Sequence, residues 1–188
     1  MKQNMKTLKI TLLTIFCLLA FTYSYAQKIN IKTGIEVLKE SNFKVLEGKR
    51  VGLITNATGV DNNLKSTVDI LSEAPNVKLV ALYAPEHGVR GDIYAGDKVE
   101  DTIDPKTGIP VYSLYGKKRE MFASMMKDID VLVYDIQDIG CRSYTFISTM
   151  GQAMQTAAAN DLEFVVLDRP NPLGGEKVEG NLVEEGFF

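Results

Sequence analysis

Five short apolar runs recur along the chain, and polar or turn-forming residues follow each of them. The runs occupy residues 51–55, 77–83, 110–114, 131–134 and 164–167. Segments with helical periodicity separate the runs, and this alternation predicts a mostly parallel α/β sheet with helices on both faces. The runs are continuously apolar, as is typical of strands that are covered on both faces. The chain is therefore expected to form an open, Rossmann-like α/β domain.

Four segments have the apolar spacing of amphipathic helices, at residues 34–40, 64–71, 119–127 and 146–160. Leu64 is expected to start the apolar face of the second. The expected buried stripe of the last is Ile147, Met150, Met154 and Ala158. The methionines are interpreted as core side chains, because methionine fills irregular core space well. Residues 88–108, rich in glycine and aspartate, predict a long irregular connection between the second and third runs.

The first 26 residues have the features of an export signal. Three lysines give a basic start, residues 10–23 are mostly apolar, and residues 24–26 form a small-x-small cleavage site. The apolar stretch is shorter than the roughly 20 residues of a membrane span. We therefore expect a signal peptide at residues 1–26 and one domain at residues 27–188. That domain is expected to be periplasmic or secreted, with no stable membrane insertion after cleavage.

Composition excludes several classes of function. Removal of residues 1–26 would take the formal net charge from −3 to −6, because that segment has three lysines and no acid. Such a chain is not expected to bind nucleic acid or anionic membranes. A single histidine excludes sites with two or more histidine ligands, and one remaining cysteine, Cys141, excludes an internal disulfide. Cys141 is interpreted as packed in the core.

Sequence motifs of the common catalytic sites are absent. The chain has no His-Glu-x-x-His, no Gly-x-Ser-x-Gly and no phosphate-binding loop. The first run leads into Thr-Asn-Ala-Thr-Gly, which lacks the glycine fingerprint of dinucleotide sites. No cofactor is therefore expected. A mononuclear metal held by Glu86, Asp135 and Asp138 is left open as an alternative, although no pattern specifies it.

The polar cluster after the second run contains the chain's single histidine. Open parallel sheets bind ligands beyond the carboxyl ends of their strands, so the clusters are expected to converge on one crevice. Glu86 lies there between Pro85 and His87. A partly desolvated carboxylic acid suits general acid catalysis. His87 is expected to contact the substrate or to set the charge state of Glu86; the alternative is a structural hydrogen bond.

The fourth and fifth runs lead into two further clusters. In residues 135–144, Asp135 and Gln137 are expected on one face, Asp138 in a turn, and Arg142 where it can grip a carboxylate. The alternative is a helix cap with a structural Asp–Arg pair. The other candidates for ligand contact are Tyr144 in the same segment, Arg169 and Asn171 after the fifth run, and Asn56 after the first. Asn56 and Thr58 are alternatively residues of a strand–helix turn.

Five ordered segments together resemble the exo-β-N-acetylmuramidases of the NamZ type. They are Thr-Asn-Ala-Thr-Gly at 55–59, Ala-Pro-Glu-His-Gly-Val-Arg-Gly at 84–91, Val-Tyr-Ser-Leu-Tyr-Gly at 111–116, residues 135–144, and residues 168–175 followed by Val-Glu-Gly at 178–180. The resemblance runs from about residue 35 to residue 181. It implies a Rossmann-like catalytic domain, followed in the family by a smaller domain that closes the crevice and is absent from this chain.

The resemblance also implies an activity. Enzymes of this family release N-acetylmuramic acid from the non-reducing ends of cell-wall glycan fragments, so muramyl sugars are the expected partners. Glycoside hydrolysis typically needs two carboxyl groups. Glu86 is the expected general acid, and Asp135 and Asp138 are candidates for the second group. Arg142 or Arg169 is expected to bind the lactyl carboxylate of muramic acid.

Three alternatives remain. The first is a non-catalytic exported module that binds sugars or cell wall in the same crevice. The second is a metal-assisted ester hydrolase. The third is that the chain does not function without a further domain, because residues 170–188 show no clear helix or strand and end in two phenylalanines.

Overall fold

The computed structural model describes residues 6, 9–16, 31–94, 97, 100–114 and 123–186. The chain divides into two units, Met1–Ile31 and Lys32–Phe188. In the first unit residues 9–16 are helical, and the expected cleavage site at residues 24–26 lies outside the described residues. None of the helices in the described part of the chain combines the length and apolar character needed to cross a membrane.

A six-stranded sheet forms the centre of the second unit, with strand order β3-β4-β2-β1-β5-β6. The strands are β1 (Arg50–Thr55), β2 (Lys78–Ala84), β3 (Thr102–Ile103), β4 (Pro110–Ser113), β5 (Val131–Asp135) and β6 (Glu163–Val166). All neighbours pair in parallel except β3 and β4, which are antiparallel. The mostly parallel α/β sheet is thus confirmed. The short edge strand β3, inside the segment expected to be irregular, was not predicted.

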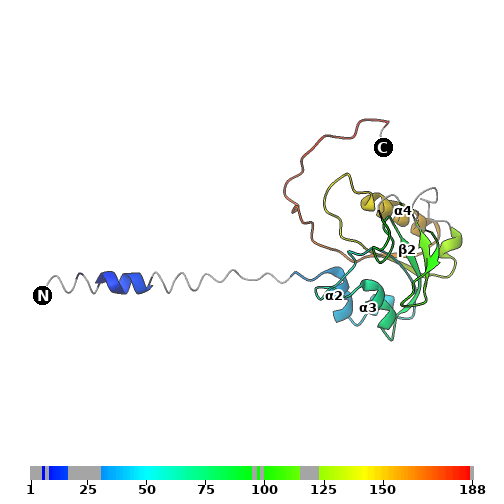
Figure 1. Ribbon diagram of the computed structural model, residues 1–188, viewed down its shortest axis with the longest axis horizontal. Coiled ribbons are helices and arrows are strands. Elements are labelled where there is room, and N and C mark those ends of the chain that lie inside the picture. Colours follow the sequence, from blue (N-terminus) through cyan, green and yellow to red (C-terminus); the bar gives the residue numbers. More distant parts are fainter. Residues whose placement is uncertain are drawn as a thin grey trace. The chain divides into compact units, whose positions relative to one another are not determined.

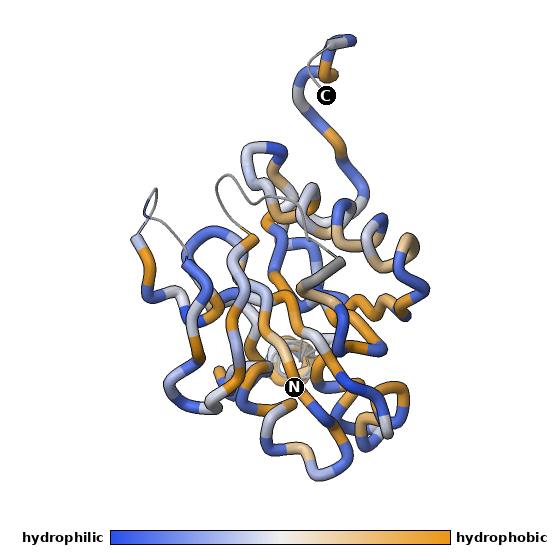
Figure 2. Tube along the Cα trace, turned by 90° about the vertical axis from the view of Figure 1, so that its right-hand side faces the viewer, coloured by the Kyte–Doolittle hydropathy of each residue, from blue (hydrophilic) through white to orange (hydrophobic). Residues whose placement is uncertain are grey.

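Helices cover both faces of this sheet. The helices are α2 (Gly34–Glu40), α3 (Thr67–Glu73) and α4 (Phe146–Ala159), with short 3-10 turns η1 (Lys44–Leu46) and η3 (Ala123–Met126). Residues of α2 and α3 pack into one hydrophobic cluster, and residues of α4 and η3 into another. Figure 1 shows α2 and α3 on one side of the strands and α4 on the other. In Figure 2, hydrophobic residues concentrate in the strands between them.

The direction of chain travel explains this arrangement. The chain moves from β1 to β2 in one direction across the sheet and from β5 to β6 in the opposite direction. Right-handed crossovers then place the connecting helices α3 and α4 on opposite faces. The strand order reverses between β1 and β5, and an open α/β sheet binds its ligand near such a reversal.

Two predicted helical faces are wrong in detail. Leu64 does not begin a helix: it is exposed with φ 61°, and α3 starts at Thr67 after the cap Ser66, whose side chain accepts a hydrogen bond from the Val68 amide. In α4, Ile147 and Met154 are exposed, whereas Ala153 and Ala157 are buried. Small side chains let α4 approach the sheet closely, and this outweighs the larger apolar area of the other stripe. Residues 119–122 of the third expected helix lie outside the described residues.

Candidate functional site

An open cleft of about 540 Å³ lies at the carboxyl ends of β1 and β2. We call it the Glu86 cleft. Three segments line it: residues 56–58 after β1, residues 86, 87 and 91 after β2, and residues 143–146 at the start of α4. The register of β1 with β2 and β5, which pairs Ile54 with Tyr83 and Thr55 with Asp135, brings the three strand ends level. The convergence of strand-end clusters is therefore seen for Asn56, Glu86, His87 and Tyr144.

A chain of hydrogen bonds orients Asn56. Its Oδ1 accepts from the amide and hydroxyl of Thr58, at 2.9 and 2.6 Å, and the Thr58 hydroxyl oxygen accepts from the Gln137 amide at 2.9 Å. Thr58 thus makes the turn after β1. Because Oδ1 is the acceptor in this turn, Nδ2 is the end of the amide left to donate to a ligand.

The turn after β2 has an unusual backbone. His87 and Gly88 both adopt left-handed conformations, with φ 73° and 77°. A non-glycine residue in such a conformation costs on the order of 1 kcal/mol or more, and such strain clusters at functional sites. The His87 Nδ1 lies 3.1 Å from the carbonyl oxygen of Ile93. Glu86 is half-buried, and within the described part of the chain its carboxylate has no hydrogen-bond or ion-pair partner.

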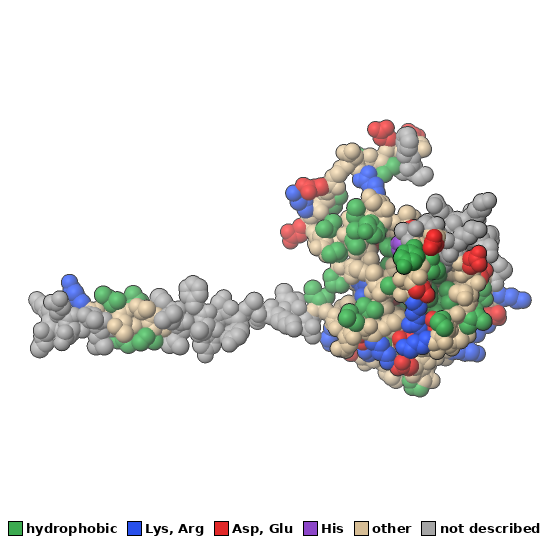
Figure 3. All heavy atoms as spheres, in the orientation of Figure 1, with side chains coloured by type: hydrophobic (Ala, Val, Ile, Leu, Met, Phe, Trp, Pro, Cys, Tyr) green, Lys and Arg blue, Asp and Glu red, His purple; other side chains and the backbone are tan. Residues whose placement is uncertain are grey.

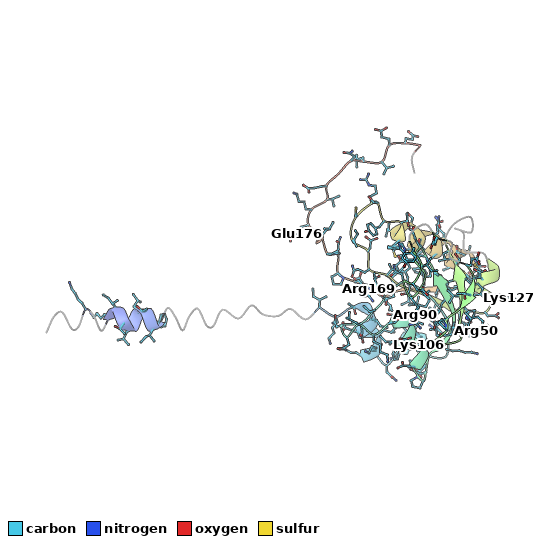
Figure 4. All side chains as sticks on the ribbon, viewed as in Figure 1. Arg50, Arg90, Lys106, Lys127, Arg169 and Glu176 are labelled. Carbon is cyan, nitrogen blue, oxygen red and sulfur yellow. The ribbon has the colours of Figure 1, made fainter. Side chains whose placement is uncertain are left out.

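An ion-pair network holds this turn in place. Arg90 donates from Nε and Nη2 to both oxygens of Asp104, each at 2.9 Å, and from Nη1 to Asp69 on α3 at 2.9 Å. Lys106 donates to the second oxygen of Asp69. Figure 4 labels Arg90 and Lys106. This network was not predictable from the sequence, because no local pattern pairs Arg90 with acids 14 and 21 residues away.

Acid is expected to weaken the fold through this network. The Arg90 guanidinium, together with the Thr107 hydroxyl and amide, holds the pKa of buried Asp104 at about 2, below its ordinary 3.8. A carboxyl group whose pKa is lower in the folded than in the unfolded protein stabilises the fold at pH values above its unfolded pKa. This contribution, about 2 kcal/mol, is lost as pH falls from about 4 to about 2.

The measurement is the free energy of unfolding by urea between pH 5 and 2. Asp104→Asn is the matched variant, and its free energy should fall less steeply over this range. An equal slope in both proteins would show that Asp104 is not responsible.

Asp135 and Arg169 form a buried ion pair. The Asp135 side chain is 0% exposed and that of Arg169 is 7% exposed. Arg169 donates from Nε to Oδ1 at 2.6 Å and from Nη2 to Oδ2 at 3.0 Å, and Thr67 donates to Oδ2 at 2.5 Å. Arg169 Nη2 also donates to the Val60 carbonyl at 2.9 Å. These contacts do not support the expected catalytic role of Asp135 or the expected binding of a substrate carboxylate by Arg169.

A second, smaller cleft of about 200 Å³ lies between α4 and the ends of β5 and β6, and Asp138 and Asn171 line it. Each side chain makes a local turn: Asp138 accepts from the Gly140 amide at 2.7 Å, and Asn171 from the Leu173 amide at 2.9 Å. Gln137 Nε2 joins the two loops by donating to the carbonyls of Asp138 and Pro170. Asp138 and Glu86 thus line different clefts.

The described residues contain no group of three or more His, Cys, Asp or Glu side chains placed to hold a metal ion. The metal set of Glu86, Asp135 and Asp138, considered from the sequence, is therefore not assembled. Asp135 is committed to Arg169, and the other two acids line separate clefts.

The loop before α4 is exposed. Tyr144 lines the Glu86 cleft with its ring 6.1 Å from that of Phe146. Arg142 does not line this cleft; its Nη2 donates to the carbonyl of Asn181 in the C-terminal segment. Cys141 is exposed, so its expected burial is wrong, and hydrogen bonding with the backbone and side chain of Ser143 lowers the pKa of its thiol.

Comparison with known proteins identifies relatives of the chain. Residues 51–188 match the family model described as exo-beta-N-acetylmuramidase NamZ, N-terminal. The chain is 55% identical over 162 residues to the peptidoglycan beta-N-acetylmuramidase NamZ of Bacillus subtilis (strain 168), a match that covers 86% of this chain and 39% of that protein.

Two crystal structures of DUF1343 family proteins from Bacteroides fragilis NCTC 9343 are also similar. The first has 72% identity and a TM-score of 0.77, covering 85% of this chain and 40% of that one. The second has 40% identity and a TM-score of 0.62, covering 75% and 35%. The chain thus spans about two fifths of the length of the curated relative.

Proposed function

The chain belongs to the family of NamZ N-terminal domains, and on this premise we propose that it is the catalytic domain of an exo-acting glycoside hydrolase. The proposed reaction releases N-acetylmuramic acid from the non-reducing ends of peptidoglycan fragments during cell-wall turnover. The 55% sequence identity to a peptidoglycan beta-N-acetylmuramidase supports peptidoglycan fragments as the substrate class. The observation that carries the chemistry is the Glu86 carboxyl in the cleft at the strand ends, which has no hydrogen-bond or ion-pair partner among the described residues.

Glu86 is the proposed general acid. It would donate a proton to the glycosidic oxygen as the bond from that oxygen to the anomeric carbon breaks, while positive charge develops on the sugar ring. Asn56 Nδ2 offers a donor to the sugar, and Tyr144 and Phe146 offer apolar surface on the opposite wall. The strained turn and the Arg90 network keep Glu86 at the cleft without engaging its carboxylate.

A typical glycosidase uses a second carboxyl group. Asp135 does not fit this role, because both its oxygens are bound inside the fold. Asp138 keeps one carboxylate oxygen outside its turn hydrogen bond and remains the candidate, from the neighbouring cleft. A further domain that completes the substrate site is part of the proposal, since the chain matches 39% of the curated relative.

We also propose that residues 1–26 direct export, so that the domain acts in the periplasm or outside the cell. The basic start, the apolar stretch and the small residues at 24 and 26 support this. N-terminal sequencing of the exported protein is expected to find Gln27 first; an intact Met1 would contradict cleavage.

The function is tested by sugar release from a chromogenic β-N-acetylmuramide, with the matching glucosaminide as substrate control and the Bacillus subtilis relative as positive control. Release from the muramide alone would support the proposal. Saturable binding of muramyl sugar without release would favour the non-catalytic binding module. Hydrolysis of an ester substrate that stops when a chelator is added would favour the metal-assisted ester hydrolase.

A further inference from the structure

We propose that His87 is the residue that selects muramyl sugars, by binding the lactyl carboxylate through Nε2 of its protonated ring. The inference rests on the proposed function and assigns a substrate group to one side chain of the same cleft. Muramic acid differs from glucosamine by a lactyl ether that carries a carboxylate. An enzyme that prefers the muramyl sugar therefore needs a cationic donor facing that group.

The charges at the Glu86 cleft point to His87. Of the described residues that line it, His87 is the one side chain that can carry a positive charge, and Glu86 is the one acid. The two arginines expected to bind the carboxylate are engaged elsewhere: Arg142 Nη2 with the Asn181 carbonyl, and Arg169 with Asp135 and Val60. In Figure 3 part of the histidine, in purple, is visible at the surface.

Within the described part of the chain, the contacts of the ring leave Nε2 without a partner. A carbonyl oxygen only accepts hydrogen bonds, so Nδ1, at 3.1 Å from the Ile93 carbonyl, must carry a proton. That bond fixes the plane of the ring and leaves Nε2 for the ligand. When Nε2 is also protonated, the imidazolium donates to a carboxylate in a charge-assisted hydrogen bond.

The backbone supplies an independent reason to assign a role to this side chain. His87 has φ 73°, where glycine would fit without strain. The fold nevertheless holds the turn rigidly. Arg90 ties it to Asp69 and Asp104, and a Cβ on Gly91 would come within 2.6 Å of the Ala57 Cβ, so the two walls of the cleft are in close contact. A strained position in a rigid cleft wall is typical of a ligand-contacting residue.

The test is a binding comparison between two ligands, N-acetylmuramic acid and its methyl ester, by titration calorimetry. The wild-type chain is expected to bind the acid about tenfold more tightly than the ester. His87→Gln should bind both ligands equally, with affinity for the ester nearly unchanged. His87→Asn serves as the second variant, because asparagine tolerates the left-handed conformation better than most residues.

The controls separate the possible failures. Arg142→Gln should keep the preference for the acid, as should a triple variant at Lys117, Lys118 and Arg119, which lie outside the described residues. An undiminished preference in both His87 variants would overturn the proposal, as would its loss in either control. Equal weakening of acid and ester in both His87 variants would also overturn it, in favour of a structural role. If the wild type binds neither ligand, the inference is overturned; if it also releases no sugar from the muramide, the proposed function fails with it.

Discussion

Glu86→Gln is expected to lower the rate of muramide release by about 10²- to 10⁴-fold while leaving substrate affinity nearly unchanged. Glutamine keeps the shape and most of the polar contacts of the side chain, but it has no acidic proton to give to the leaving oxygen. Because the Glu86 carboxylate makes no hydrogen bond or ion pair with the described residues, the substitution should not disturb the fold. Release kinetics, substrate binding and urea unfolding of the variant test the three expectations.

Asp138→Asn is the parallel test, an equally conservative change in the candidate for the second carboxyl group. Asp138 lines the second cleft and caps the Gly140 amide, a bond that asparagine can also accept. A wild-type rate in Glu86→Gln would remove Glu86 from the acid role. A loss in Asp138→Asn as large as that in Glu86→Gln would instead identify Asp138 as the second catalytic carboxyl, and would make the two clefts parts of one substrate site.

The central strands were predictable because they are buried on both faces and are therefore mostly apolar. β1 and β5 are examples: their predicted ranges, 51–55 and 131–134, match the observed strands to within one residue at each end. The apolar spacing of residues 34–40 likewise predicted α2, and in the structure Thr33 and Glu36 form a capping box at its start. Local sequence patterns are sufficient to predict an element where they determine which of its residues are buried.

The rotation of α4 was not predictable in the same way. Its sequence offers two stripes, one with Ile147 and Met154 and one with Ala153 and Ala157, and hydrophobicity alone favours the first. In the fold the stripe with Ala153 and Ala157 faces the sheet, because a helix with small residues on its inner face packs closer to the strands. The outcome depends on the shape of the surface that the helix covers, which no local pattern contains.

The functional site likewise has one feature that was predictable from the sequence and one that was not. Glu86 and Asp135 both lie at the carboxyl ends of strands, so the sequence predicted a catalytic role for each, Glu86 as the general acid and Asp135 as one candidate for the second carboxyl group. The difference between them is a partner: Asp135 meets Arg169, 34 residues further along the chain, whereas Glu86 meets no described cation. Pairing over such a distance depends on strand order and register. The position of an acid at the crevice was therefore predictable, but its availability to a ligand was not.

Asp135→Asn is expected to lower the free energy of unfolding by about 3–5 kcal/mol. The substitution leaves the Arg169 guanidinium, 7% exposed, without a counterion inside the fold. It also weakens the contact to Thr67 at the start of α3, so three segments that meet beneath the cleft lose their common anchor. Urea unfolding should show a lower midpoint with an unchanged dependence on denaturant, since the surface exposed on unfolding stays the same.

Asp130→Asn is a closely matched control. Asp130 lies just before β5, whereas Asp135 ends it. Asp130 also accepts two side-chain hydrogen bonds from one arginine, Arg50, and a third from the Arg50 backbone amide. The side chains of that pair are 42% and 39% exposed, so water compensates for most of the lost charge and the destabilisation should be much smaller. If the two variants lose equal stability, burial is not what makes the Asp135 pair important.

A double variant distinguishes the loss of the Asp135–Arg169 attraction from the cost of leaving the Arg169 charge buried without a partner. Arg169→Met in the Asp135→Asn background removes the buried cation and should restore part of the lost stability, because an isolated buried charge costs more than a missing pair. Arg169 and Asp135 would then be established as structural supports of the cleft. A double variant that is less stable than Asp135→Asn alone would show instead that Arg169 stabilises the fold independently, through its bond to the Val60 carbonyl.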